Sequence, residues 1–290
     1  EESPTGFLWQ NDPRSALEVS EEERLATFED LWSKPGFSKW LGNFSDIMVS
    51  REANETFAEF VRNKIRERVH DPVVAEMLTP KDYPFGAKRV PMETGYYEAF
   101  NRDNVLLVDV HKAPIERITP KGIKTSDAEY EFDIIIFATG YDAITGSVVR
   151  MDIRGEGGQT IKDKWANGPR NYLLLQSNGF PNLFFVQNYA FCNHSRCAEA
   201  MAEWVSDCIS YMRENEYGRI EATLEAEDAW TRRAAELIEG SLIRESNAWW
   251  NGANIDGKSR TFLLYGDSAP NYRAQMSDAA AKGYEGFVLK

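Results

Sequence analysis

The stretch DIIIFATGYDAITG, which runs from Asp133 to Gly146, indicates the fold class of this chain. Its apolar run over residues 134–137 is typical of a strand that is covered on both faces, as in parallel sheets. Gly140 follows the run and would let the backbone approach a ligand closely. Ligands of open α/β sheets bind beyond the carboxyl ends of the strands. The stretch therefore indicates a nucleotide-binding strand, or a buried strand that ends in a tight turn, yet no glycine-rich phosphate loop stands near it.

The composition is that of an ordinary globular protein and excludes several kinds of partner. The chain has 290 residues, of which 42% are hydrophobic and 27% are charged. Its net charge of −13 would repel nucleic-acid phosphates and anionic lipid surfaces, so we expect neither as a partner. No apolar run approaches the roughly 20 residues of a membrane helix. No signal peptide is visible and there are three cysteines, an odd number, so we expect a cytoplasmic location.

The first residues, EESPTGFLWQNDP, contain no initiator methionine. We expect the sequence to be the C-terminal part of a longer chain, with a processed or trimmed start as the alternative. No internal repeat or flexible linker divides the sequence, so the segments are expected to pack as one body.

Helical patterns dominate residues 15–78. Ser20, with Glu23 three positions later, predicts a capping box at the start of the first helix. An apolar stripe at helical spacing predicts a second helix that Asp71-Pro72 closes, and residues 73–78 predict a short third one.

The pattern becomes extended after Pro84. A Pro-Lys-Gly turn within residues 113–125 predicts a hairpin. A long helical region with a buried stripe is expected over residues 196–240. Further strands are predicted over residues 104–110, 128–140, 171–176, 183–186 and 262–265.

Lys88 and Arg89 form an adjacent basic pair between Gly86 and Pro91, in a segment with little helical or strand character. Two neighbouring cations on a fixed loop could clamp a phosphate. Arginine is never deprotonated in proteins, so Arg89 could also stabilise an anion during a reaction. A solvated basic pair is the alternative, and the pair alone does not decide between the two.

Trp249 and Trp250 lie in a loop rich in Gly and Asn. Large aromatic side chains in a loop usually pack onto something, which here is either a planar ligand or the core.

The segment from Cys192 to Cys197 also contains His194. The spacing C-x-H-x2-C fits no common zinc pattern and no second ligand pair follows, so we expect no metal. His194 precedes a predicted helix, where either a bound ligand or a capping role is possible.

Together these stretches resemble a known family. KDYPFGAKRVPMETGYYEAFNRDNVLLVDV (residues 81–110), APIERITPKGIKT (113–125), DIIIFATGYDAITG (133–146), GFPNLFF (179–185) and WWNGAN (249–254) follow one another in the order found in that family. The chain resembles the C-terminal half of the Baeyer–Villiger monooxygenases, the class B flavoprotein monooxygenases. The resemblance covers nearly the whole chain.

The resemblance implies a reaction that uses FAD, NADP(H) and O₂. In the family NADPH reduces FAD, O₂ then forms a C4a-peroxyflavin, and this peroxide converts a ketone into an ester or lactone. The small-molecule ketone, O₂ and the missing N-terminal half of the same protein are the implied partners. The alternatives are an N- or S-oxidising flavin monooxygenase and a truncated, non-catalytic interaction module.

The implied fold class is α/β, with the C-terminal parts of two Rossmann-like dinucleotide-binding domains and a helical insertion. Residues 1–84 resemble the helical insertion, residues 85–135 the second part of the NADP domain, and residues 136–290 the second part of the FAD domain. The family's two glycine-rich nucleotide loops belong upstream, and these 290 residues contain neither. We therefore expect this portion to be inactive without the upstream half.

The resemblance also implies roles for individual residues. Arg89 matches the catalytic arginine, and Lys88 matches the lysine that contacts the 2′-phosphate of NADP. Trp249 matches the tryptophan of the loop that closes over the cofactor. The other implied cofactor-binding residues are Ala138, Thr139 and Gly140, which join the two nucleotide domains, and Asn193 and His194, where the chain passes the flavin.

Overall fold

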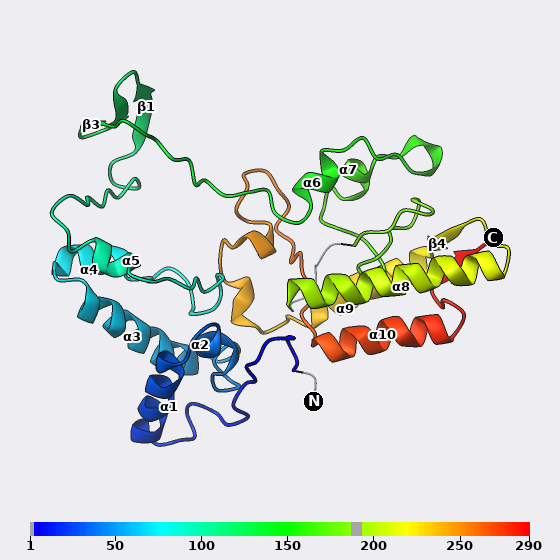
Figure 1. Cartoon of the computed structure of the whole chain (residues 1–290), viewed down its shortest axis with the longest axis horizontal. Coiled ribbons are helices and arrows are strands. Elements are labelled where there is room, and N and C mark those ends of the chain that lie inside the picture. Colours follow the sequence, from blue (N-terminus) through cyan, green and yellow to red (C-terminus); the bar gives the residue numbers. More distant parts are fainter. Residues whose placement is uncertain (1–2, 187–192) are drawn as a thin grey trace. The chain divides into compact units, whose positions relative to one another are not determined.

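The computed structural model describes residues 3–186 and 193–290 (Figure 1). Two compact units divide the chain. Unit 1 takes in Glu1–Asn54, Tyr83–Val90 and Asp142–Lys290, whereas unit 2 takes in Glu55–Asp82 and Pro91–Tyr141. Among the described residues, no helix is both long and apolar enough to cross a bilayer.

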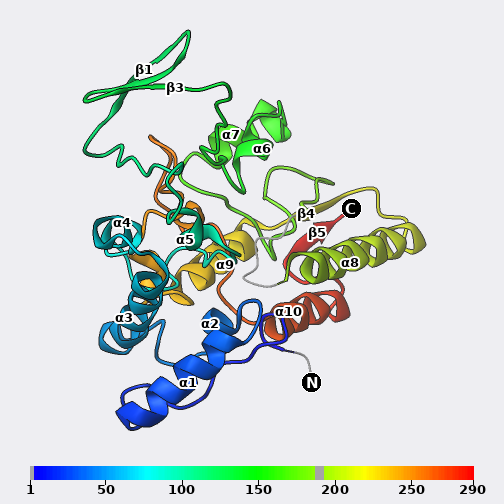
Figure 2. The same cartoon turned by 60° about the vertical axis from the view of Figure 1, so that its left-hand side comes forward.

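The C-terminal half of unit 1 is a packed group of helices with a small sheet. Figures 1 and 2 show α8 and α10 side by side, and Trp204 of α8 donates a hydrogen bond from Nε1 to the carbonyl of Met276 at 2.9 Å. Strands β4 and β5 pair in antiparallel register. The elements of this half are α8 (His194–Glu214), β4 (Ile220–Ala222), α9 (Leu224–Glu236), α10 (Ala269–Ala281) and β5 (Phe287–Leu289).

Helix α8 confirms the helical stripe expected from the sequence. Its buried residues recur every three or four positions, so one face of the helix meets the core. Cys208 lies in this stripe, and burial raises the pKa of its thiol to about 12. A thiol with so high a pKa is a packing group rather than a nucleophile. The buried residues of α8 are Cys197, Met201, Trp204, Cys208 and Met212.

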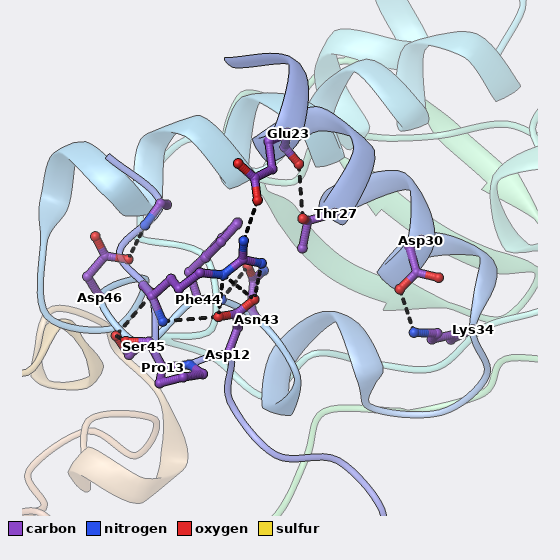
Figure 3. Close-up of polar contacts among 12 residues, drawn as sticks. Asp12, Pro13, Glu23, Thr27, Asp30, Lys34, Asn43, Phe44, Ser45 and Asp46 are labelled. Carbon is purple, nitrogen blue, oxygen red and sulfur yellow. Dashed lines mark hydrogen bonds and ion pairs between the residues drawn. The ribbon is translucent and has the colours of Figure 1, made fainter. Parts of the chain in front are cut away.

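The N-terminal part of unit 1 begins with α1 (Glu21–Ser33) and the short α2 (Ser38–Leu41). The Ser20 side chain caps α1 by accepting a hydrogen bond from the Glu23 backbone N–H at 3.2 Å, as expected. The Glu23 carboxylate, however, bonds to the Arg14 guanidinium, which also pairs with Asp12 (Figure 3). Only the serine half of the predicted capping box therefore forms, because Arg14 is a charged partner for Glu23.

Short elements connect these parts of unit 1. Tyr172 and Gln176 form an isolated bridge around a tight turn, and Leu173 and Leu174 adopt positive φ angles of 52° and 60°. The predicted strand over residues 171–176 is therefore wrong: the apolar side chains are buried, but in a turn. The remaining elements are α6 (Gly146–Val149), η1 (Glu156–Gly158), α7 (Ile161–Lys164), η2 (Leu242–Arg244) and η3 (Trp249–Asn251).

Unit 2 combines helices with a three-stranded antiparallel sheet. Its small core is formed by Ile65, Val69 and Ala75. The Pro-Lys-Gly turn joins β1 to β2, which confirms the predicted hairpin. The elements are α3 (Arg51–Arg68), which begins in unit 1, then α4 (Pro72–Leu78), α5 (Tyr96–Ala99), β1 (Ile115–Thr119), β2 (Gly122–Thr125) and β3 (Glu129–Glu131).

Strand β3 confirms the first part of the strand predicted over residues 128–140, but the rest of that strand and the one predicted over residues 104–110 are wrong for the described residues. Residues 133–140 are extended but belong to no sheet, and Ile134 and Ile136 are 77% and 84% exposed. Residues 104–110 are irregular, with Leu106 70% exposed. A buried parallel strand needs a ladder partner and a cover on each face, and the described residues supply neither for these segments.

Unit 1 differs from the sequence-based expectation in three further places. Residues 183–186 form no strand, although the Phe185 N–H donates to the Leu175 carbonyl at 2.8 Å. Residues 262–265 form no strand either, although the Leu263 N–H bonds to the Trp250 carbonyl at 2.7 Å. Helix α10 was not predicted, although Ser268 caps it with Pro270 in its first turn, which is a recognisable start signal.

A buried charge fastens the turn before residue 180 to α9. Glu227 is fully buried, and its carboxylate pairs with Lys164 Nζ at 2.7 Å and Arg170 Nε at 3.4 Å and accepts a hydrogen bond from the Asn178 backbone N–H at 3.0 Å. Asp228, its neighbour, is half-exposed and pairs with Arg170.

We expect Glu227→Ala to lower the free energy of unfolding by about 3 kcal/mol, because it leaves the buried ammonium of Lys164 without its carboxylate. Asp228→Ala removes an equal charge from a half-exposed pair and should cost less than about 1 kcal/mol. Urea unfolding of the two variants measures the difference. Equal losses would show that the buried pair contributes no more than a surface pair.

Candidate functional site

The Lys88-Arg89 pair stands at the end of a loop in unit 1. Gly86 and Ala87 are buried, whereas Lys88 and Arg89 are exposed. Gly86 has a φ of +78°, and a Cβ atom there would lie 2.6 Å from Met48 Sδ. Only glycine satisfies both the backbone conformation and the space at this position.

Two buried polar side chains clamp the loop from either side of Gly86. Asn54, only 2% exposed, donates from Nδ2 to the Phe85 carbonyl at 2.9 Å and accepts the Phe85 N–H on Oδ1 at 2.8 Å. Ser246, only 4% exposed, donates from Oγ to the Ala87 carbonyl at 2.5 Å. Asn54 and Ser246 were not recognised in the sequence; Asn54 precedes an apolar stripe and Ser246 lies in a loop, with no local signal of either contact.

The two cations lie over aromatic rings. Lys88 Nζ is 4.3 Å from the centre of the Tyr83 ring, and the Arg89 guanidinium carbon is 5.6 Å from that of Phe37. Neither cation forms an ion pair with a carboxylate of residues 3–186 or 193–290. In a chain with a net charge of −13, two such cations side by side form a site suited to an anion.

The tryptophan turn η3 packs close to the same loop. Trp250 is 1% exposed and stacks on Trp40 with ring centres 6.0 Å apart, so the core-packing alternative is confirmed for Trp250. Trp249 is only partly buried and meets Trp250 edge-on at 5.3 Å. Phe37 in turn contacts Trp40 at 6.0 Å. A continuous row of rings therefore connects the Arg89 side chain to Trp249.

Ala138, Thr139 and Gly140 belong to unit 2, so they are described separately from Lys88 and Arg89. All three are exposed and lie outside any helix or strand, and Gly140 has a φ of +86° with open space around its Cβ position. The structure places no described side chain against that position.

The chain re-enters unit 1 at Asp142, where it meets the tryptophan loop. Lys258, which follows WWNGAN in the sequence, donates from Nζ to Asp142 Oδ1 at 2.5 Å and to the Ala143 carbonyl at 3.1 Å. Lys258 is a further residue that we did not single out in the sequence. Its position in the G-K-x-R run after WWNGAN was the feature of the sequence that could have identified it.

Asn193 and His194 begin α8. The Asn193 side chain caps the helix by accepting the Arg196 N–H at 3.4 Å, and its own N–H donates to the Thr5 carbonyl at 2.7 Å. His194 is exposed in the first turn. Cys192 lies outside the described residues, and within them no group of three His, Cys, Asp or Glu side chains is arranged to hold a metal ion.

Comparison with known proteins places these features in a family. The 2-oxo-Δ³-4,5,5-trimethylcyclopentenylacetyl-CoA monooxygenase of Pseudomonas putida is 48% identical over 292 residues, which cover 98% of this chain and 54% of that protein. A Baeyer–Villiger monooxygenase of Pseudooceanicola batsensis is 41% identical over 290 residues, covering 99% of this chain and 53% of that protein. No family model matches the chain.

The crystal structure of OTEMO in complex with FAD and NADP superimposes with a TM-score of 0.95 at 48% identity, over 99% of this chain and 54% of that chain. This chain corresponds to the C-terminal portion of the Baeyer–Villiger monooxygenases. It spans about half the length of the relatives it matches. The predicted α/β fold class, with parts of two dinucleotide-binding domains, is confirmed by this similarity to a Baeyer–Villiger monooxygenase fold.

The comparisons also show how much of each relative this chain leaves unmatched. About half of each Baeyer–Villiger relative has no counterpart in these 290 residues.

Proposed function

We propose that the complete protein is an FAD- and NADPH-dependent monooxygenase that converts ketones into esters or lactones. The observation that carries the proposal is the pair Lys88-Arg89, held without a carboxylate partner on a clamped loop beside the tryptophan turn. A bound flavin, once reduced by NADPH, supplies the activation of O₂.

The two cations of this chain have different tasks in the proposal. Lys88 is a compact point charge that binds the 2′-phosphate of NADPH. Arg89 provides a fixed planar cation for the negative charge that develops on oxygen during insertion next to the carbonyl. Because Asn54 and Ser246 hold the loop backbone on either side of Gly86, the backbone of Arg89 does not need to be ordered at the moment of reaction.

The other expected site residues support binding and closure. We assign Trp249 to closing the cofactor site, since it is partly exposed at the end of the ring row. Ala138, Thr139 and Gly140 are assigned to the crossing between the two nucleotide domains, and Asn193 and His194 to the approach to the flavin. The division into a helical insertion (1–84), an NADP part (85–135) and an FAD part (136–290) belongs to the same proposal.

The remaining half of the same polypeptide is the proposed structural partner. Ile134, Ile136 and Phe137 expose large apolar side chains on an extended backbone that has no ladder partner among the described residues. Such a segment is suited to insertion between strands of a parallel sheet. The glycine-rich loops that hold the two nucleotides are expected in that half.

Oxygenation of ketones by the complete enzyme under ¹⁸O₂ tests the proposed function. We expect one ¹⁸O atom in each ester and one NADPH oxidised per ester, with no product when NADPH is omitted. Amines and thioethers are assayed in parallel. Oxidation of nitrogen or sulfur without an ester from any ketone would identify an N- or S-oxidising enzyme, and a protein that neither holds flavin nor consumes NADPH would support the non-catalytic module.

A further inference from the structure

We propose that Ser246 is a positioning residue, which sets the backbone of Lys88 and Arg89 relative to the tryptophan turn. The inference rests on the proposed function of those two cations. Ser246 itself has no predicted contact with substrate or cofactor, and it acts through the two loops that it connects.

The side chain of Ser246 connects it to the loop that carries Lys88 and Arg89. The Ser246 hydroxyl donates to the Ala87 carbonyl, and both residues are at least 96% buried, since Ser246 is 4% and Ala87 0% exposed. The peptide group is planar, so holding the carbonyl oxygen of Ala87 also fixes the orientation of the Lys88 N–H. The two cations therefore leave the loop in a direction that this one hydroxyl determines.

The backbone of Ser246 connects it to the tryptophan turn η3. The Ser246 carbonyl accepts a hydrogen bond from Asn251 Nδ2 at 3.1 Å, and Asn251 is the last residue of η3. Asn251 Nδ2 also bonds to the Ile243 carbonyl at 2.9 Å, which ties η3 to η2. A single buried residue thus bonds to the peptide before Lys88 and to the turn that carries Trp249.

Asn54, the other clamp, cannot replace this contact. It bonds to Phe85, and Gly86 stands between Phe85 and Ala87. Glycine permits the widest range of backbone angles, so fixing Phe85 leaves the direction of the following peptide less determined. Ser246 bonds to Ala87, which follows Gly86 in the sequence and directly precedes the two cations.

The test compares Ser246→Ala, Ser246→Thr and Ser177→Ala in the complete enzyme. Ser177 is the matched control, because its buried hydroxyl also donates to a backbone carbonyl, that of Arg170, and it has no described bond to residues 83–90. The measured quantity is the amount of ester formed per NADPH oxidised, which does not depend on the fraction of folded enzyme. Hydrogen exchange of the peptide that contains Lys88 and Arg89 is measured on the same samples.

We expect Ser246→Ala to reduce the ester formed per NADPH about tenfold, with the balance appearing as hydrogen peroxide, since small displacements of a charged group at a reacting centre are costly. Ser246→Thr retains the hydroxyl and should restore the ratio to within about twofold of the wild type, and Ser177→Ala should match the wild type. Faster exchange of the Lys88 amide is expected in Ser246→Ala only.

Three results would overturn the inference: an unchanged ratio in Ser246→Ala, an equal loss in Ser177→Ala, or no recovery in Ser246→Thr. A wild-type enzyme that reduced its flavin but made no ester would contradict the proposed function instead. The exchange of the Lys88 amide in the two alanine variants would then decide whether Ser246 orients the cations.

Discussion

Replacing Arg89 by alanine is expected to lower the rate of ester formation about 10³-fold, while NADPH still reduces the flavin at a rate within about threefold of the wild type. Removing one preorganised charge that faces a developing anion typically costs 10²- to 10³-fold in rate, so about that loss is expected here. Hydride transfer precedes the step that needs this charge. Anaerobic stopped-flow measurement of flavin reduction and chromatographic assay of the ester separate the two steps.

Arg51→Ala is the matched control for Arg89→Ala. Arg51 is an exposed arginine of the same unit that pairs with Glu245, and its removal changes the net charge equally. Ester formation should remain within about twofold of the wild type in this variant. If Arg89→Ala retained more than a tenth of the ester formation, or if it lost flavin reduction to the same degree, the assigned role of Arg89 would be wrong.

Replacing Lys88 by alanine is expected to raise the KM for NADPH about 30- to 100-fold and to leave the KM for NADH nearly unchanged. A charge-assisted hydrogen bond to a phosphate contributes roughly 2–3 kcal/mol, and NADH has no 2′-phosphate. The ratio of kcat/KM for NADPH to that for NADH measures this effect directly. The preference of the wild type should weaken with added salt, because exposed charges are screened.

Lys282→Ala serves as the control for Lys88→Ala, since Lys282 is an exposed lysine that pairs with Asp278 at the end of α10. Its removal should leave the ratio between the two nicotinamide cofactors unchanged. An equal rise of both KM values in Lys88→Ala would indicate a general loss of binding, and the phosphate contact would then belong to another residue.

The sequence predicted the features of this fold that depend on nearby residues. Helices α1, α3 and α8 were recognisable because apolar side chains repeat with the helical period and because Ser20 supplies a start signal. The hairpin of β1 and β2 was recognisable from its turn. These elements are stabilised by contacts within a few positions along the chain.

The sequence did not predict the features that depend on contacts between residues far apart along the chain. The strand pattern of residues 133–140 is genuine, but a strand forms only with a partner, and none of the described residues provides one. The clamps on the Lys88-Arg89 loop join residues 31 and 159 positions apart. Hydrogen bonds from a side chain to such a distant backbone leave no periodicity or motif, so Asn54 and Ser246 became visible only in the structure.

The exposed run after Asp133 also makes this chain prone to aggregation. Residues 134–139 carry no charge, glycine or proline and have high β-propensity, which is the composition of segments that stack into cross-β aggregates. An unpaired edge that accepts a strand from its own polypeptide accepts one from a neighbouring molecule equally well. In the proposed complete protein, heat or proteolysis that removes the partner strands of this run would therefore lead to irreversible aggregation, and the rate of that removal would set the lifetime of the protein.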